Sequence, residues 1–263
     1  VYQTINQIEQ AKKYLEEAIL IDETFTVADQ KLSMLEKYHQ DHPHLLKMLD
    51  KLENLKLTDY QKVSLYFGLY KAFKDIKDYN KSFYYLKIGN SIQRNLLKYD
   101  ISIHKSLSKK IKDIFSKLNL KNYVKSDNGK NYIFVLGMPR SGTTLIEKII
   151  SSHPKASTIS ESNFIPEKVI KYIYADLNNL KKFLDTDFQN EYEKFIKLFN
   201  IKKDVIVDKT LSNFWYIGFI KIFFPKSKII HVSRNPKDNC LSIYENLFDY
   251  PEGWHSQENE LAE

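Results

Sequence analysis

Residues 132–145 read Tyr-Ile-Phe-Val-Leu-Gly-Met-Pro-Arg-Ser-Gly-Thr-Thr-Leu. The apolar run 132–136 predicts a buried strand, and Gly137 and Gly142 allow the chain to turn tightly before a helix begins. At the start of such a helix, successive N–H groups and the helix dipole both favour negative charge. The segment therefore predicts an anion site between a strand and a helix, with Leu145, Ile146, Ile149 and Ile150 as the buried face of that helix.

The cation of this loop stands in an unusual place. The two glycines have the spacing of the nucleoside-triphosphate P-loop, but Thr143 replaces the lysine that reaches the β- and γ-phosphates there. Arg140 lies inside the loop instead, and an arginine fork suits several oxygens of one tetrahedral anion. This pattern argues against an ATPase or a kinase.

Further short apolar runs follow the loop and predict a parallel sheet. They cover residues 205–207 and 228–232, and their lack of alternation is typical of strands buried on both faces. Residues 166–200 have the pattern of two amphipathic helices, and 213–224 of another. We therefore expect an α/β fold, with a P-loop-type parallel sheet sandwiched by helices.

The half of the chain before the loop is predicted to be all-α. Apolar residues at three- and four-residue spacing predict helices from residue 5 to 118, and Thr58 with Gln61 forms a capping-box pattern at one helix start. The expected helices after the first cover residues 25–38, 44–54, 58–77, 79–97 and 101–118.

Five residues of this half follow the pattern of a tetratricopeptide (TPR) helix pair: Leu69, Phe73, Ser82, Leu86 and Gly89. An ordinary helical bundle would give much of the same pattern, and either structure makes this half a scaffold or a surface for a protein partner. The polar stretch 125–130 marks a boundary. We expect a TPR-like segment over residues 1–124 and an α/β domain over 131–263.

Composition limits the classes of partner. Hydrophobic residues make up 43% of the chain, as in a folded globular protein, and the net charge of +7 favours anionic partners. The lysines are spread along helix faces, so nucleic acid is not expected as a partner. The single cysteine, Cys240, excludes an internal disulfide and any metal site built of several cysteines. No apolar stretch reaches about 18 residues, so we expect a soluble, cytoplasmic chain without a membrane segment.

The segment Pro139–Leu145 resembles the 5′-phosphosulfate loop of sulfotransferases, in the arginine form of the tyrosylprotein sulfotransferase branch. The segment Lys228–Ser242 is similar to the part of these enzymes that binds the 3′-phosphate of the nucleotide, with Arg234 and Ser242 at the matching positions. Together the two motifs imply 3′-phosphoadenosine 5′-phosphosulfate (PAPS) as the donor. The residues implied to bind it are Pro139, Arg140, Ser141, Gly142, Thr143, Thr144, Arg234 and Ser242.

The resemblance also implies the catalytic residues. Glu161 lies where the tyrosylprotein branch has its base, although it could instead cap the helix that follows. Lys209 matches a lysine that neutralises the transferring group, with Arg140 as the other cation, although it could instead be a surface lysine. Sulfuryl transfer requires a base, cations and an in-line geometry, and no metal site is expected.

The whole chain resembles bacterial proteins that join TPR repeats to a sulfotransferase domain. Relative to them it is expected to be truncated at both ends, so the chain itself could be inactive and an upstream targeting segment could be missing. The acceptor stays open among a protein tyrosine, a carbohydrate and a small molecule. Two other classes also stay open: an interaction module with an inactive nucleotide-binding domain, and a P-loop phosphotransferase.

Overall fold

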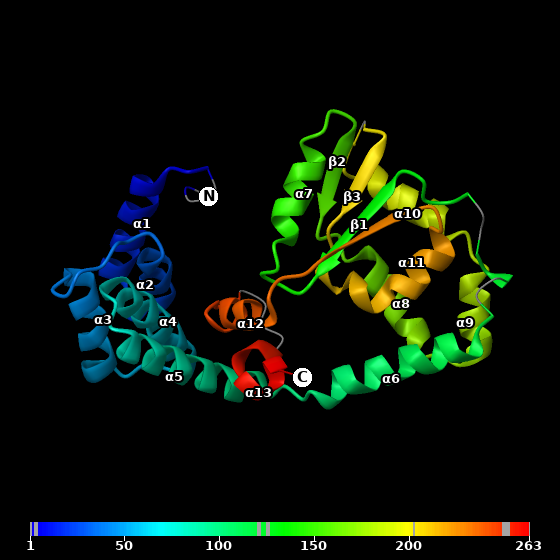
Figure 1. The fold of residues 1–263 in the computed structure, drawn as a ribbon. Helices are drawn as coiled ribbons and strands as arrows, with labels where there is room; N and C mark the ends of the chain where they lie inside the picture. Colours follow the sequence, from blue (N-terminus) through cyan, green and yellow to red (C-terminus); the bar gives the residue numbers. More distant parts are fainter. Residues whose placement is uncertain are drawn as a thin grey trace. The chain divides into compact units, whose positions relative to one another are not determined.

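The structure is a computed structural model that describes residue 2 and residues 5–119, 122–124, 127–201, 203–248 and 253–262. The chain forms two compact units, shown as ribbons in Figure 1. One comprises residues 101–239 and the other residues 1–100 together with 240–263. We call them the sheet unit and the helical unit.

The sheet unit contains four parallel strands in the order β2-β3-β1-β4. They are β1 (Tyr132–Gly137), β2 (Ala156–Ser160), β3 (Val205–Asp208) and β4 (Lys228–Val232). Three of them were predicted, and the expected α/β fold with a parallel sheet is confirmed. The central strands β1 and β3 are almost fully buried, but β4 at the edge is half-exposed, so it does not have the two buried faces that its apolar run predicted.

Helices cover both faces of this sheet. Figure 1 shows α7 (Thr143–Ser151) on one side and α8 (Phe164–Ile173), α10 (Phe188–Lys197) and α11 (Ile217–Phe223) on the other. The remaining helices of the unit are α6 (Ser102–Lys117), α9 (Leu177–Leu184), the 3-10 helix η2 (Leu211–Tyr216) and the start of α12 (Pro236–Tyr244). The core on the second side is aromatic, with Phe134 of β1 packed against Tyr192 and Phe224.

The segment between β2 and β3 differs from its prediction. It holds three helices, α8, α9 and α10, where the periodicity predicted two. Asp176 and Asp187 cap the second and third helices by accepting backbone N–H groups, which interrupts the continuous pattern. Residues 213–224 likewise form η2 followed by α11 rather than one helix.

The prediction for the face of α7 is wrong. Leu145 and Ile149 are 65% and 58% exposed, whereas Thr143 and Glu147 are the buried residues. Thr143 and Glu147 are four residues apart and therefore share one face of the helix. This face, and not the more apolar one, is turned into the protein.

The helical unit begins with α1 (Ile8–Ile21), α2 (Thr26–Ser33), α3 (Pro43–Asn54), α4 (Asp59–Ile76) and α5 (Tyr79–Leu97). The predicted capping box is confirmed, because the amide of Gln61 donates to Thr58 and the Gln61 side chain accepts the amide of Thr58. Helix α2 ends earlier than predicted, at Ser33.

Helices α4 and α5 pack closely at the small residues that the repeat pattern singled out. A Cβ atom on Gly89 would lie 3.1 Å from Cβ of Tyr66, and the hydroxyl of Ser82 donates to the carbonyl of Tyr70 at 3.0 Å. Small side chains thus allow the close approach of the two helices. The assignment as a TPR remains a prediction.

The last part of the chain belongs to the helical unit. It contains the end of α12, the 3-10 helix η3 (Trp254–Ser256) and α13 (Glu258–Ala262). Tyr244 packs against Phe67 and Leu86, and Arg94 binds both carboxylate oxygens of Glu260 at 2.7 and 2.8 Å. The compact units therefore divide at residues 100 and 239, and the predicted domains 1–124 and 131–263 remain a sequence-based assignment.

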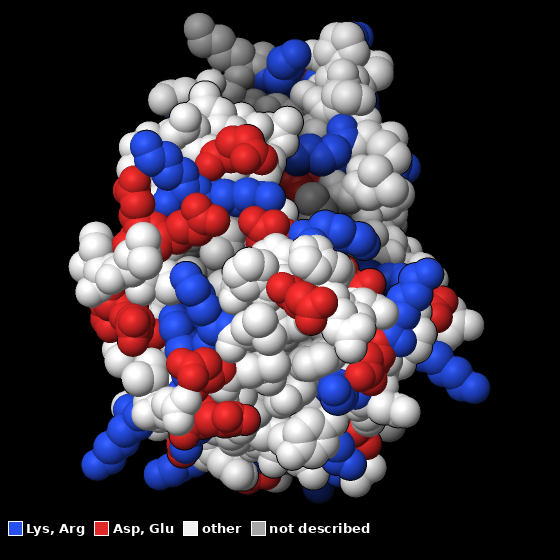
Figure 2. Space-filling view, turned by 90° about the vertical axis from the view of Figure 1, so that its left-hand side faces the viewer, with Lys and Arg blue, Asp and Glu red and all other residues white. Residues whose placement is uncertain are grey.

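Charges are mixed on the face shown in Figure 2, where Lys and Arg side chains alternate with Asp and Glu. Among the described residues, no helix combines the length and the apolar content needed to cross a membrane.

Candidate active site at the carboxyl ends of the strands

The loop between β1 and α7 requires glycine for steric reasons. Gly137 has a φ of 150° and Gly142 one of 106°, in the region that side chains disfavour. A Cβ atom on Gly137 would lie 2.4 Å from the carbonyl oxygen of Val232 in β4. Arg140 is also left-handed, with a φ of 65°, so the loop is sharply folded rather than extended.

Donors from the β4–α12 segment hold the carbonyl groups of this loop. Asn239 donates its side-chain amide to the carbonyl of Pro139 at 3.2 Å, and the Arg234 guanidinium donates to the carbonyl of Arg140 at 3.4 Å. In a trans peptide the C=O and the following N–H point in opposite directions. The amide of Arg140 is therefore directed away from Asn239. The second predicted motif thus positions the first, through the described contacts of Arg234 and Asn239.

The loop leads directly into the first turn of α7. Ser141 donates its hydroxyl to the carbonyl of Met138 at 2.7 Å, and Gly142 stands at the N-cap position. The amides of Thr143 and Thr144 follow, and amides in the first turn of an α-helix have no intrahelical acceptor. Thr144 and Arg140 are exposed. An anion at this point would meet the amino end of α7 together with a guanidinium.

The structure brings Glu161 and Lys209 together from 48 positions apart in the sequence. The pairing of β2 with β3 shifts register between Thr158 and Ser160, where Ser160 has a φ of 53°. The amide of Lys209 donates to the carbonyl of Ser160 at 3.0 Å. This local bend aims the next residue, Glu161, at Lys209, whose ammonium donates to the Glu161 carboxylate.

A second carboxylate, which the sequence analysis did not identify, lies beside the same lysine. Glu147 of α7 is 1% exposed, and its Oε2 lies 3.8 Å from Nζ of Lys209. Its other oxygen accepts the hydroxyl of Thr158 at 2.6 Å. The only sequence signal is a pair of charged residues, Glu147 and Lys148, between the apolar positions of this helix. Lys209 is itself 4% exposed, so it is not a surface lysine.

Asp208 is fully buried at the end of β3 and forms a hydrogen-bond network next to Glu161 and Lys209. Its carboxylate accepts the hydroxyls of Ser162, Tyr192 and Thr210 at 2.8, 2.8 and 2.7 Å. Burial raises the pKa of the Asp208 carboxyl above its ordinary value, and these hydrogen bonds partly oppose the shift. Ser162 follows Glu161 and Asp208 precedes Lys209. The hydrogen bond between Ser162 and Asp208 therefore fixes the backbone next to both candidate catalytic residues.

Ser242 is the one predicted donor-binding residue that does not belong to the sheet unit. It lies on α12 after the division at residue 239. Its role stays a prediction. Among the described residues, no group of three or more His, Cys, Asp or Glu side chains is arranged to hold a metal ion.

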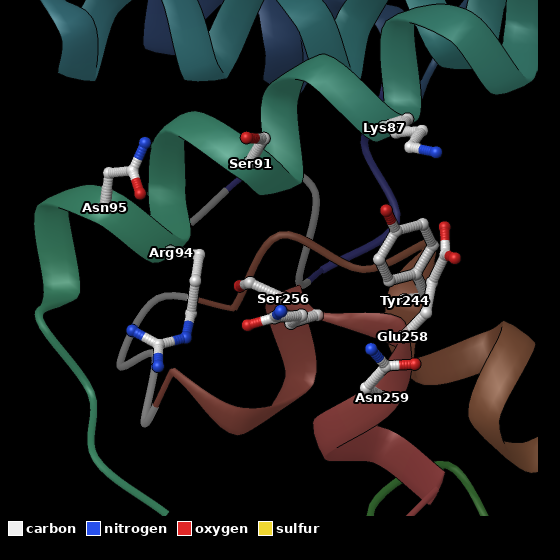
Figure 3. A pocket seen from close by; sticks show the side chains of 9 residues that line it. Lys87, Ser91, Arg94, Asn95, Tyr244, Ser256, Glu258 and Asn259 are labelled. Atoms are coloured by element: carbon white, nitrogen blue, oxygen red, sulfur yellow. The ribbon is translucent and has the colours of Figure 1, made fainter.

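The helical unit has a pocket of its own, with a volume of about 300 Å³. Figure 3 shows Ser91, Arg94 and Asn95 of α5 on one side and Tyr244 and Glu258 on the other. None of the predicted site residues lines it. This pocket is therefore not part of the candidate active site, which is identified by the chemistry of its residues.

The sheet is parallel, a folded loop precedes α7, and charged residues lie at the carboxyl ends of the strands. Open α/β sheets bind their ligands at these carboxyl ends, and the loop before α7 suits an anionic ligand. Residues 132–262 match the model of the sulfotransferase family. The match supports a transferase.

The chain is also similar to an uncharacterized protein of Aquifex aeolicus (strain VF5). The two are 29% identical over 264 residues, which covers 94% of this chain and 34% of that protein. The chain thus spans about a third of the length of this relative.

Proposed function

We propose that the sulfotransferase-family domain moves a sulfuryl group from PAPS to an acceptor hydroxyl. The observation that carries the proposal is the pairing of Glu161 with the buried Lys209. Lys209 directly follows the carboxyl end of β3, and the β1–α7 loop follows the carboxyl end of β1, the neighbouring parallel strand. A candidate base and a candidate cation lie side by side, beside a helix amino terminus suited to an anion.

The surroundings of Gly142 support the proposed binding of the phosphosulfate part of such a donor at this loop. An added Cβ at Gly142 would lie 3.9 Å from Cγ1 of Val232, an ordinary van der Waals distance, so Val232 does not press closely on the loop at this point. In the proposal the loop residues bind the 5′-phosphosulfate, and Arg234 and Ser242 bind the 3′-phosphate. The loop residues with this role are Pro139, Arg140, Ser141, Gly142, Thr143 and Thr144.

The chain's residues have distinct tasks in the transfer. Glu161 accepts the proton of the acceptor hydroxyl as its oxygen forms a bond to sulfur. The bond between sulfur and the bridging oxygen of the donor breaks, and its electrons stay on the leaving phosphate. Lys209 and Arg140 stabilise the negative charge on the transferring group and on that phosphate. The products are a sulfate ester and adenosine 3′,5′-bisphosphate.

The acceptor is a protein tyrosine, a carbohydrate hydroxyl or a small molecule. The helical unit is proposed to bind a protein partner through its TPR-like helices. An interaction module with an inert sheet unit and a nucleotide-dependent phosphotransferase are the two competing functions.

Nucleotide preference separates these three functions in one experiment. We expect adenosine 3′,5′-bisphosphate to raise the melting temperature of the chain and ATP with Mg²⁺ to leave it unchanged. The reverse preference would identify a phosphotransferase, and no response to either nucleotide would favour the interaction module.

Arg140→Ala is the matched variant for this test. Because Arg140 supplies the cation of the loop, its loss should abolish the stabilisation by adenosine 3′,5′-bisphosphate. Lys155→Ala, which removes an exposed cation between α7 and β2, should leave it intact. An unchanged response of Arg140→Ala would remove the loop from nucleotide binding.

A further inference from the structure

Lys209 lies between two carboxylates of very different exposure. Its side chain is 5% exposed, and those of Glu147 and Glu161 are 2% and 50% exposed. A buried ammonium that loses its counter-ion is strongly destabilising. Glu147 is therefore the interior partner of the lysine, and Glu161 is the partner that a ligand can reach.

Glu147 is held in place from two directions. The Thr158 hydroxyl donates to its Oε1 at 2.6 Å, and Thr158 in turn accepts the amide of Ser160 at 2.8 Å. Glu147 also lies one turn after Thr143, on the helix that the loop begins. Glu147, the anchor of Lys209, is thus linked through α7 to the loop and through Thr158 to the strand that leads to Glu161.

The cluster contains one ammonium, that of Lys209, and two carboxylates, those of Glu147 and Glu161. The two carboxylates can have different tasks. The Lys209 ammonium donates a hydrogen bond to a carboxylate oxygen of Glu161, so that oxygen is already occupied. While Lys209 binds Glu161, an acceptor hydroxyl cannot use this oxygen as its hydrogen-bond partner. Moving the lysine to a sulfuryl oxygen would free Glu161, and Glu147 would remain close enough to balance the ammonium.

We infer that Glu147 is a positioning residue for the transfer: it retains Lys209 in the interior while the lysine leaves Glu161 for the oxygens of the transferring group. The inference rests on the proposed function. In it, the arrival of the donor frees the Glu161 carboxylate for the acceptor hydroxyl, because the sulfuryl group and Glu161 compete for the same ammonium.

The test compares two nucleotides that differ only in the sulfuryl group. Without the charge of Glu147, Lys209 has Glu161 as its one carboxylate partner among the described contacts and is drawn away from the donor. Calorimetry should show that Glu147→Gln weakens PAPS binding about tenfold, the effect of one charge-assisted hydrogen bond, and changes adenosine 3′,5′-bisphosphate binding by less than about twofold.

Two further variants complete the test. Thr158→Val removes the hydroxyl that holds Glu147 and should weaken PAPS binding in the same selective way, so it decides the matter if Glu147→Gln fails to fold. Glu191→Gln neutralises a surface carboxylate paired with Lys168 and should bind both nucleotides as the unaltered chain does.

The outcomes distinguish the two proposals. If the unaltered chain binds neither nucleotide, the proposed function fails and this inference with it. If the chain binds both and Glu147→Gln and Thr158→Val bind them equally well, or lose both to the same extent, Glu147 has no positioning role and the proposed function stands.

Discussion

At the residue scale, the site depends on the difference between Glu161 and Asp208. Glu161 is half-exposed and paired with Lys209, whereas Asp208 is fully buried and accepts several hydroxyls. A base must reach a proton of the acceptor, so Glu161 suits that task and Asp208 does not. Asp208 instead fixes the segments on which Glu161 and Lys209 stand.

Glu161→Gln is expected to remove the proposed base and leave the nucleotide site intact. Loss of a general base typically lowers a rate by about 10²–10⁴-fold, and we expect sulfuryl transfer to fall by this amount while the Kd for adenosine 3′,5′-bisphosphate changes little. Transfer from labelled PAPS and calorimetry measure the two quantities. Glu167→Gln, an exposed residue of α8, is the control, and unchanged turnover in Glu161→Gln would exclude Glu161 as the base.

Asp208→Asn should alter how stability depends on pH. Because burial raises the pKa of Asp208, the folded chain binds this proton more tightly than the unfolded chain does. Asp208 therefore adds to the free energy of unfolding in full when the pH is below its pKa in the unfolded chain. This contribution is lost as the pH rises through its higher pKa in the folded chain. The stability advantage of the unaltered chain over Asp208→Asn should therefore narrow as the pH rises from about 4 upwards.

Urea unfolding at a series of pH values measures this advantage. Asp204→Asn, which changes an exposed aspartate just before β3, should show no such dependence. A difference in unfolding free energy between the unaltered chain and Asp208→Asn that stays constant, or grows as the pH rises, would contradict the raised pKa of Asp208.

At the element scale, the β1–α7 loop is shaped by its neighbour β4. Gly137 pairs with Val232 in the parallel register of the two strands. Donors at Arg234 and Asn239, just beyond β4, then hold the carbonyls of the loop. The two sequence motifs therefore form one structural element, in which the second motif supplies the contacts that hold the first.

Gly137→Ala is expected to break this element. The new methyl group would collide with a backbone carbonyl that cannot move without separating β1 from β4, and we expect a loss of about 3 kcal/mol or more in unfolding free energy. Gly142→Ala is the matched comparison, since its methyl group would lie at an ordinary van der Waals distance from Val232, which leaves only the cost of the left-handed backbone, about 1–2 kcal/mol. Equal losses in chemical denaturation would show that the close approach to Val232 is unimportant.

At the scale of the whole molecule, each compact unit contains its own core, and the chain passes from the helical unit to the sheet unit and back. The family match over residues 132–262 therefore extends into the helical unit, where its last residues pack on α5. The segment that matches the sulfotransferase family thus ends inside the helical unit.

Arg94→Ala should loosen the end of the chain within the helical unit. The bidentate ion pair with Glu260 is mostly buried, with side-chain exposures of 20% and 13%, and its loss should lower the opening free energy of α13 by about 1–3 kcal/mol. Hydrogen exchange should become faster in residues 254–262. Lys87→Ala on the same helix should leave exchange there unchanged, and equal protection in both variants would contradict the role of the ion pair.

Local sequence determined the features that depend on neighbouring residues. The apolar run before Gly137, the two glycines and the capping residues Thr58 and Gln61 act within a few positions, so their patterns predicted β1, the loop and the start of α4 correctly. The residue types at 140, 161 and 209 pointed to anion and proton chemistry in the same way, through a resemblance carried by short motifs.

Only the tertiary structure decided which distant residues meet. Strand β2 has weak apolar character and exists because β3 provides a parallel partner, and the bend at Ser160 then sets Glu161 beside Lys209. The apolar residues of α7 were expected to form its buried face, yet Thr143 and Glu147 are the buried residues. The physical reason is that burial and ion pairing depend on what packs against a side chain, and periodicity along one helix does not contain that information.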